Sequence, residues 1–360
     1  MTIMRNGVTH ALLAAALFGA STPLAKMLTA QMAPTLLAGL LYAGSGIGLT
    51  ACLLWRSIRA RSNPLGPAPA VAGLRRADAG WLGAAILAGG VAGPLLLLAG
   101  LASMPGSSAA LLLNLEGVFT ALLAWFVFHE SFDRRILLGM AGIVAAGLLL
   151  SWSSGAGSVL APGALAITGA CLCWALDNNL TRKVAASDAL QIAAWKGVVA
   201  GSVNLIAATM LGVTWPAPTL VLAAGLLGFC GYGVSLVLFV LALRQLGSAR
   251  TGAYFSAAPF VGAALAVLLL QEATSTRFWL ATVLMAIGLW LHLTERHQHV
   301  HIHEPALHTH VHTHAPDPHH QHAHDFPWQD NALPHTHAHQ HDAIAHTHAH
   351  FPDIHHRHRH

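Results

Sequence analysis

The chain has 360 residues, of which 55% are hydrophobic and only 9% are charged, and its formal net charge is +4 when histidine is counted as neutral. Soluble domains carry about 25% charged residues, so this composition excludes a soluble fold for most of the chain. Long uncharged runs separated by short charged segments predict an integral membrane protein.

The apolar runs predict the membrane-spanning helices. About 20 apolar residues cross a bilayer core, so runs of about twice that length must turn back once, at Gly, Pro and Ser clusters such as residues 104–107. The result is an all-α protein with ten transmembrane helices. Their expected ranges are residues 8–25, 34–55, 80–101, 107–128, 135–152, 160–178, 190–212, 219–243, 249–270 and 277–293.

The distribution of Lys and Arg predicts the orientation, because cytoplasmic loops carry an excess of these residues. If the N-terminus is cytoplasmic, the outer side keeps only Lys26 and Arg277. With ten crossings the C-terminus is cytoplasmic as well. The inner side then collects Arg5, Arg56, Arg59, Arg61, Arg75, Arg76, Arg134, Arg135, Arg182, Lys183, Arg244, Arg250 and Arg296.

The helices also predict an internal repeat. The aligned segments are 107–130 with 249–272, and 17–26 with 173–182. In the first alignment Glu130 falls over Glu272. Because each half has five helices, an odd number, the second half enters the membrane from the opposite side, as in the inverted repeats that underlie alternating access in secondary transporters. The predicted domains are residues 1–152, 153–294 and a His-rich tail, 295–360.

Two motifs recur at matching places in the halves: an aromatic, small and polar stretch at 18–23 and 174–179, and a Glu closing the fourth helix at 129–130 and 271–272. With them the chain resembles the EamA branch of the drug/metabolite transporter (DMT) superfamily over about residues 1–293. The resemblance implies a ten-helix carrier of the bacterial inner membrane, often an exporter of amino acids, metabolites or drugs. The expected partners are a small-molecule substrate and the lipid bilayer, with a second copy of the chain as a candidate and no nucleic acid.

Charges inside a membrane are costly and tend to face a cavity or a partner. Glu116 lies about nine residues into the predicted helix 107–128, near half depth at about 1.5 Å per residue. Its counterpart in the second half is Ala258, so the predicted site is asymmetric. The candidate substrate-binding or coupling residues are Glu116, Asn114, Lys196, Asp177, Asn178, Trp174 and Ser256.

Three roles for Glu116 and Lys196 stay open. They form a structural ion pair, or they bind the two charged ends of a zwitterionic substrate, or Glu116 titrates as the proton-coupling group. Residues 177–179 either line the same cavity or cap the end of their helix. For Glu130 and Glu272 capping, or pairing with Arg134, Arg135 or Arg277, is the favoured role.

The tail holds 23 of the 26 histidines, and its prolines and scarce apolar residues predict a disordered accessory segment. Histidine at every second position can chelate Ni(II), Zn(II), Co(II) or Cu(II). A tolerated low-complexity extension and a pH-responsive polycation are the alternatives. The candidate metal ligands are His308, His310, His312, His314, His335, His337, His339, His341, His346, His348 and His350.

Three functions follow from these features. The first is a secondary-active carrier of small metabolites, amino acids or drugs, with export as the expected direction. The second is efflux of a divalent metal (Ni, Co or Zn), or a metal-regulated permease, which the tail favours and the helices oppose because they lack a cluster of His, Asp and Glu. The third is a metal-buffering module anchored by the helices. No nucleophile with a base and no phosphate loop is visible, so neither an enzyme nor a required cofactor is expected.

Overall fold

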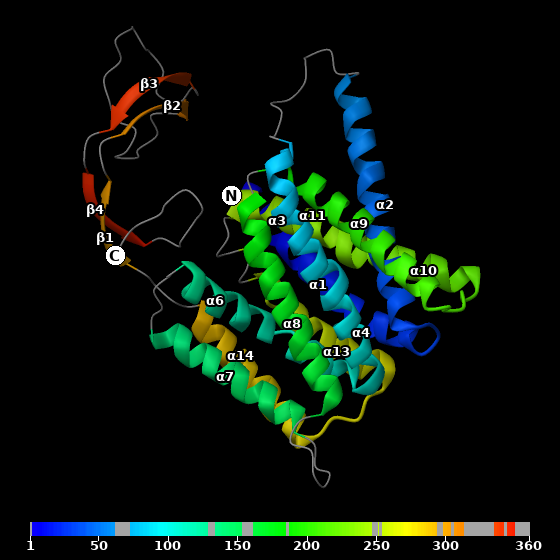
Figure 1. Cartoon of the computed structure of the whole chain (residues 1–360). Coiled ribbons are helices and arrows are strands. Elements are labelled where there is room, and N and C mark those ends of the chain that lie inside the picture. Colours follow the sequence, from blue (N-terminus) through cyan, green and yellow to red (C-terminus); the bar gives the residue numbers. More distant parts are fainter. Residues whose placement is uncertain are drawn as a thin grey trace. The chain divides into compact units, whose positions relative to one another are not determined.

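A computed structural model divides the chain into a helical unit, Met1–Glu295, and a second unit, Arg296–His360 (Figure 1). Each unit is described by itself below. The residues that the structure describes are 2–61, 73–128, 134–152, 161–184, 187–246, 251, 254–293, 298–303, 306–312, 335–341 and 344–349.

The first half of the helical unit follows the predicted ranges closely, with extra breaks inside two of them. Its third predicted helix contains a π-helix, η2, and its fourth is divided in two. The elements are α1 (Thr2–Thr29), α2 (Pro34–Arg61), η1 (Arg76–Asp78), α3 (Ala79–Ala85), η2 (Ile86–Ala92), α4 (Gly93–Ser103), α5 (Gly106–Leu112), α6 (Leu115–Phe128) and α7 (Arg134–Ser151).

The second half contains the corresponding series, and its eighth predicted helix again contains a π-helix, η4. The elements are α8 (Pro162–Thr181), η3 (Arg182–Val184), α9 (Ala189–Met210), α10 (Pro218–Gly228), η4 (Phe229–Val234), α11 (Ser235–Leu246), α13 (Ala258–Leu270) and α14 (Thr276–Leu293).

The helical unit is apolar on its outside as well as inside. Ile47, Leu222 and Trp290 expose 69%, 63% and 62% of their surface, which suits contact with lipid rather than water. Among the described residues, seven helices are long and apolar enough to cross a membrane. Shorter apolar helices cover Ala258–Leu270 and Thr276–Leu291. The chain is therefore a multi-pass membrane protein.

The two halves share their irregularities as well as their helices. The alignment that sets Glu130 over Glu272 places η2 over residues 228–234, which is where η4 lies. A turn at residues 113–114 interrupts the fourth helix of the first half, and a turn at 256–257 precedes α13. At both turns the backbone N–H groups bond three residues back instead of four. The repeat therefore extends to local backbone structure, which apolar patterning alone did not predict.

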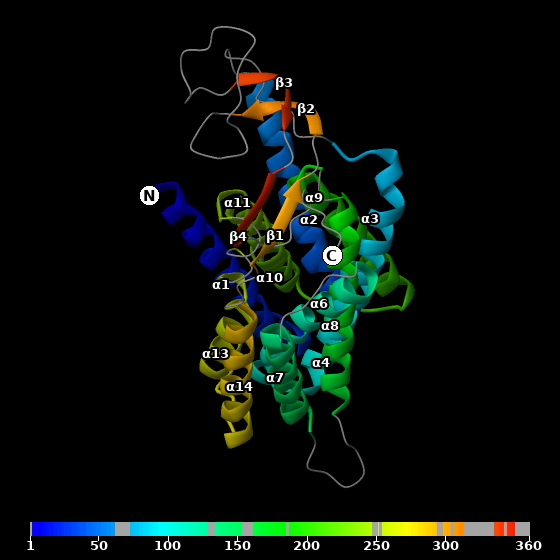
Figure 2. The same ribbon diagram turned by 90° about the vertical axis from the view of Figure 1, so that its left-hand side faces the viewer.

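The halves exchange their first helices. Helix α1 packs against α11 and α13 of the second half, while α8 packs against α4 and α6 of the first half. Equivalent helices also pack directly against each other, α2 along α9 and α7 along α14 (Figures 1 and 2). Each half thus holds its partner's first helix between its own third and fourth segments.

Glycines bring α2 and α9 into backbone contact. A Cβ atom on Gly46 would lie 2.4 Å from the backbone nitrogen of Val198, and one on Gly197 would lie 2.5 Å from the nitrogen of Gly46. Real Cβ contacts are not that short, so both positions require glycine. Small residues allow this approach where lipid gives no hydrophobic drive for helix association.

The residues described in the second unit, which was predicted to be disordered, lie on four strands. Strand β1 (Gln298–His303) pairs antiparallel with β4 (Ile344–Ala349), and β2 (Ala306–His312) pairs antiparallel with β3 (His335–His341). The alternation of His with Val, Ile, Thr and Ala has the period of two that belongs to a strand. The sequence argument noted histidine at every second position but took it as a chelating pattern and not as a strand pattern.

Candidate functional site

The break in the fourth helical segment places Glu116 in the first turn of α6. The N-terminus of a helix carries the positive end of its dipole, and a carboxylate is stabilised there. Glu116 is half-buried, and no atom lies within 4 Å of the point where a Cβ on the adjacent Gly117 would be. The break therefore presents a carboxylate beside open space in the middle of the predicted span 107–128.

The C-terminal end of α8 supplies the partner of this carboxylate. Asn178 Nδ2 donates to Glu116 Oε1 at 2.8 Å and lies 3.4 Å from Thr120 Oγ1. The neighbouring Asn179 donates to backbone carbonyls, those of Ala175 at 2.8 Å and Thr120 at 3.4 Å. Asn178 thus bonds the side chain of Glu116, whereas Asn179 bonds backbone carbonyls, and a role for either in lining a cavity stays a prediction.

A second polar group lies one residue earlier on α8. Lys196 Nζ on α9 donates to Asp177 Oδ1 at 2.5 Å and to Thr181 Oγ1 at 2.8 Å, and Thr181 donates to Asp177 at 2.9 Å. The ion pair is mostly buried, with side-chain exposures of 18% for Lys196 and 13% for Asp177. Its two charges cancel within one hydrogen-bonded triad.

This pairing argues against one of the three open roles, a structural ion pair between Glu116 and Lys196. Both side chains are described, and the ion pair of Lys196 is with Asp177. Among the residues whose side chains the structure describes, Glu116 has no ion-pair partner. When Glu116 is ionised, the cluster of Glu116, Asp177 and Lys196 accordingly carries one net negative charge, which resides on Glu116.

The π-helix η2 lies beside this cluster. A π-helix widens the turn and leaves carbonyl groups without their usual α-helical donors. Gly89 O accepts from Trp174 Nε1 at 2.9 Å and from Tyr42 Oη at 2.8 Å, while Gly90 O accepts from Asn204 Nδ2 at 2.9 Å. Side chains of α8, α2 and α9 therefore meet on one stretch of η2.

Gly89 also lets the Asp177 side chain pack against η2. A Cβ atom at Gly89 would lie 2.1 Å from Asp177 Oδ2, so only glycine leaves room for the carboxylate. Sequence analysis missed Tyr42, Asn204 and Gly89 because it considered charged residues. The Gly89–Gly90 pair within a long apolar run is the signal that could have indicated a break.

Aromatic side chains from both halves lie close to one another beside η2. Tyr232 of η4 lies 5.6 Å from Tyr42 and 5.9 Å from Phe18, measured between ring centroids. Phe18 lies 5.5 Å from Phe255, which precedes the turn at Ser256. Polar groups of this region thus come from α6, α8 and α9, and aromatic groups come from α1, α2 and η4.

Two of the predicted site residues have other surroundings. Asn114 Nδ2 donates to Leu111 O at 2.9 Å, a backbone carbonyl at the helix break, and lies 3.8 Å from Met285 Sδ on α14. The side chain therefore contacts α14 and not Asn178. Ser256 lies half-buried in the turn before α13. Roles for both in substrate binding stay predictions.

Glu272 caps a helix, as one of its two expected roles requires. It accepts hydrogen bonds from the backbone N–H groups of Gly106 at 2.6 Å and Ser107 at 2.9 Å, which begin α5. On the other side of this turn, Lys26 Nζ donates to the carbonyls of Leu101 and Met104. Glu130 lies outside the described residues.

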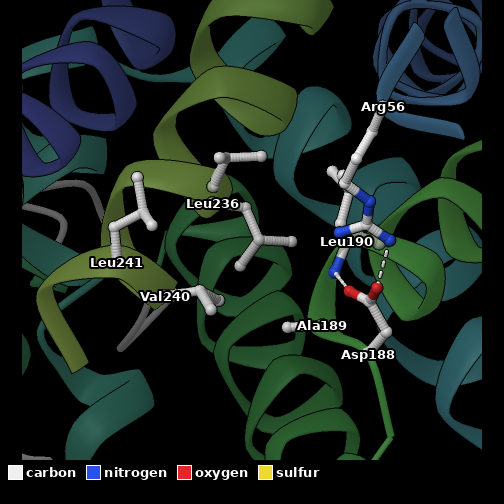
Figure 3. A pocket seen from close by; sticks show the side chains of 9 residues that line it. Arg56, Asp188, Ala189, Leu190, Leu236, Val240 and Leu241 are labelled. Atoms are coloured by element: carbon white, nitrogen blue, oxygen red, sulfur yellow. Dashed lines mark hydrogen bonds and ion pairs between the residues drawn. The ribbon is translucent and has the colours of Figure 1, made fainter. Parts of the chain in front are cut away.

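A pocket of about 100 Å³ lies elsewhere, between the end of α2, the start of α9 and α11 (Figure 3). Arg56 and Asp188 form an ion pair at its edge, and Asp188 caps α9 by accepting from Leu190 N at 2.9 Å. Burial raises the pKa of the Asp188 carboxyl, but hydrogen bonds from Arg56 and from the backbone of Leu190 and Gln191, together with the charge of Arg56, outweigh burial and lower the pKa below its ordinary value. None of the lining residues belongs to the Glu116 cluster.

Metal-ligating side chains do not gather within the part of the chain whose side chains are described. No group of three or more His, Cys, Asp or Glu lies close enough there to hold a metal ion. Of the predicted ligands in the tail, His314 and His350 fall outside the described residues, and the others lie on strands β2, β3 and β4.

Comparison with known proteins adds to this geometry. The profile of the EamA-like transporter family matches residues 5–152 and 161–294. A protein named "Uncharacterized transporter" from Methanothermobacter thermautotrophicus (strain Delta H) is 28% identical over 284 residues, which cover 76% of this chain and 82% of that protein. A crystal structure of a protein at 19% identity aligns with a TM-score of 0.55, covers 81% of this chain and 95% of that chain, and shows a shared fold.

Proposed function

The chain belongs to the EamA-like transporter family, and from this premise we propose that it is a secondary-active carrier that exports small metabolites, amino acids or drugs across the bacterial inner membrane. Ten crossings with both termini in the cytoplasm fit the Lys and Arg distribution. The exchanged packing of the halves supports alternating access, because α1 and α8 occupy equivalent positions between the third and fourth segments of the opposite halves.

The observation that carries the proposal is the Glu116 carboxylate, which lies at a helix break with a neutral partner, Asn178, and no ion-pair partner among the described side chains. A buried charge without a counter-ion is costly. A proton or the cationic group of a substrate lowers that cost when it binds. We therefore assign Glu116 the role of the group that binds a cationic moiety or a proton.

The Asp177–Lys196 pair has a different role in this proposal. Because Lys196 is already neutralised by Asp177, it holds α8 against α9 and does not bind the carboxylate of a zwitterion. The aromatic side formed by Tyr42, Tyr232 and Phe18 supplies apolar contact for the rest of the substrate. The favoured substrate is thus a small molecule with an amino group and an apolar part.

The helices do not support divalent-metal efflux to the same extent. An ion that leaves water needs several ligands, and the described side chains of the helical unit offer no such group. Glu116 alone, with an amide as partner, is a poor site for Ni(II) or Zn(II), which prefer imidazole and thiolate ligands.

A ligand screen tests this assignment. Purified protein in detergent is heated with amino acids, primary amines, carboxylic acids without an amino group, or divalent metal salts, and the unfolding temperature is recorded. A ligand that binds only the folded state raises that temperature. We expect stabilisation by compounds that carry an amino group, and loss of that stabilisation in Glu116→Gln. Equal stabilisation of both proteins by an acid without an amino group would contradict the assignment.

A further inference from the structure

A proline explains why the third helical segment of the first half is irregular. Pro94 lies in the first turn of α4, directly after η2. In an α-helix the carbonyl of Gly90 would accept from the backbone N–H of residue 94, and proline has none. The N–H of Gly93 bonds to Ala88 O, five residues back, so the carbonyl of Gly89 lacks its α-helical donor as well. Two successive carbonyls are therefore left for other donors.

Side chains from three other helices bond these two carbonyls. Gly89 O accepts from Trp174 of α8 and from Tyr42 of α2, so both lone pairs of that oxygen are used. Gly90 O accepts from Asn204 Nδ2 of α9 at 2.9 Å. Asn204 thus takes the place of the missing proline N–H.

Asn204 is completely buried, with 0% of its surface exposed. Its Nδ2 also donates to Ala200 O at 2.9 Å, within its own helix. Its Oδ1 has no hydrogen-bond partner among the residues that the structure describes. A buried acceptor without a partner is costly, and an apolar side chain of similar size would avoid that cost. The donor of this amide, and not its oxygen, therefore accounts for its place between α9 and η2.

The same stretch of η2 fixes one turn of α8. Trp174 and Asp177 are three residues apart, on one face of that helix, and both contact Gly89. Trp174 does so through its hydrogen bond to the carbonyl, and a Cβ atom on Gly89 would lie 2.1 Å from Asp177 Oδ2. The next residue, Asn178, donates to Glu116. A change in the geometry of η2 would therefore move the donor of the Glu116 carboxylate.

We propose that Asn204 is a positioning residue of the carrier. By bonding the carbonyl that Pro94 leaves without a donor, it keeps η2 in its π-helical form, and η2 holds the turn of α8 that presents Asn178 to Glu116. Asn204 acts on the carboxylate through η2 and α8, because its own two hydrogen bonds go to backbone carbonyls. This inference rests on the role proposed above for Glu116.

A double-mutant cycle tests the link between Asn204 and Pro94. Asn204→Leu removes the donor, whereas Pro94→Ala restores a backbone N–H four residues after Gly90. The dissociation constant of an amine that stabilises the wild type is measured for the four proteins in detergent. We expect Asn204→Leu to weaken amine binding about tenfold when Pro94 is present, because a hydrogen bond to a charged group contributes about that much and the Glu116 carboxylate is held less well.

In the Pro94→Ala background the same change should weaken binding only about twofold or less, since Gly90 O then has a backbone donor. The unfolding temperature should change little, because Asn204→Leu also removes the unpaired Oδ1. If leucine prevents folding, Asn204→Ala takes its place in the cycle with the same expected pattern. An equal loss of affinity in both backgrounds, or no loss in either, would overturn the proposal.

Fluorine NMR of protein labelled with 5-fluorotryptophan gives a readout that needs no substrate. The signal of Trp174 is the one that disappears in Trp174→Phe. We expect Asn204→Leu to shift this signal, because Trp174 Nε1 bonds to Gly89 O, and to shift it less in the Pro94→Ala background. An unchanged signal would contradict the effect of Asn204 on η2, even if no amine binds the wild type and the role of Glu116 fails. A shifted signal with unchanged amine affinity would overturn the positioning role.

Discussion

Glu116→Gln is expected to lower transport about 30-fold or more. Glutamine has nearly the same shape, and its side-chain oxygen can still accept the hydrogen bond from Asn178 Nδ2. The variant therefore inserts and folds, but it can neither take up a proton nor neutralise a cation. Removing the carboxylate that pairs with a bound cation costs about 2 kcal/mol or more, which corresponds to about a 30-fold change in transport. Initial rates in proteoliposomes, normalised to inserted protein, measure the effect.

Glu272→Gln is the matched control for this substitution. Glu272 is also half-buried, but its two oxygens cap the first turn of α5. The change should lower the unfolding temperature, since a cap contributes about 1 kcal/mol, and leave the transport rate near that of the wild type. If Glu116→Gln transports as fast as Glu272→Gln, the Glu116 carboxylate neither binds nor couples.

Lys196→Met is expected to cause the largest loss of stability among single changes in the cluster. It leaves Asp177, whose side chain is 13% exposed, without its cation. Removing one partner of a buried ion pair costs about 3–5 kcal/mol, because an uncompensated charge remains in a poorly solvated place. Thermal unfolding in detergent and the yield of folded protein give the measurement.

The double variant Asp177→Asn with Lys196→Met separates the ion pair from simple loss of packing. With both charges removed, most of the lost stability should return, since no unpaired charge is left. A double variant as unstable as Lys196→Met would show that the methylene groups of Lys196, and not its charge, hold the contact with α8.

Much of the helical unit could be predicted from apolar runs and their punctuation. Each predicted range overlaps a described helix, because a crossing needs about 20 apolar residues and little else interrupts such runs. The π-helices η2 and η4 were beyond this argument. Their sequences, ILAGGVA and FCGYGV, are as apolar as their neighbours, and the change from α to π geometry leaves hydropathy unaltered.

The candidate site was predicted in part. Depth along a helix can be counted at about 1.5 Å per residue, which identified Glu116. A Glu116–Lys196 ion pair was one of three roles left open, and the sequence argument did not compare depths across the α8–α9 connection, where Lys196 has its partner Asp177. Asp177 lies one turn before the end of α8 and Lys196 lies two turns after the start of α9. Antiparallel helices joined by a short connection place such residues at similar depth, so this pair was accessible to sequence reasoning.

Sequence reasoning could not determine which face of a helix contacts which neighbouring helix. Asn114 and Glu116 are two residues apart, yet one contacts α14 and the other contacts α8, because the break at residues 113–114 changes the direction of the side chains. The strands of the tail show a similar gap, since low apolar content predicted disorder where the alternation of residues allows strand pairing.

Counterflow in proteoliposomes tests the central claim, that this protein is a carrier in which Glu116 binds the transported cation or proton. Vesicles containing the purified protein are loaded with an excess of an unlabelled amine or amino acid that stabilised it, and the same compound in labelled form is added outside at low concentration. A carrier with alternating access accumulates label transiently above its equilibrium level, and the account predicts this overshoot for the wild type and its absence for Glu116→Gln. A simple approach to equilibrium by the wild type, or an undiminished overshoot in Glu116→Gln, would contradict the account.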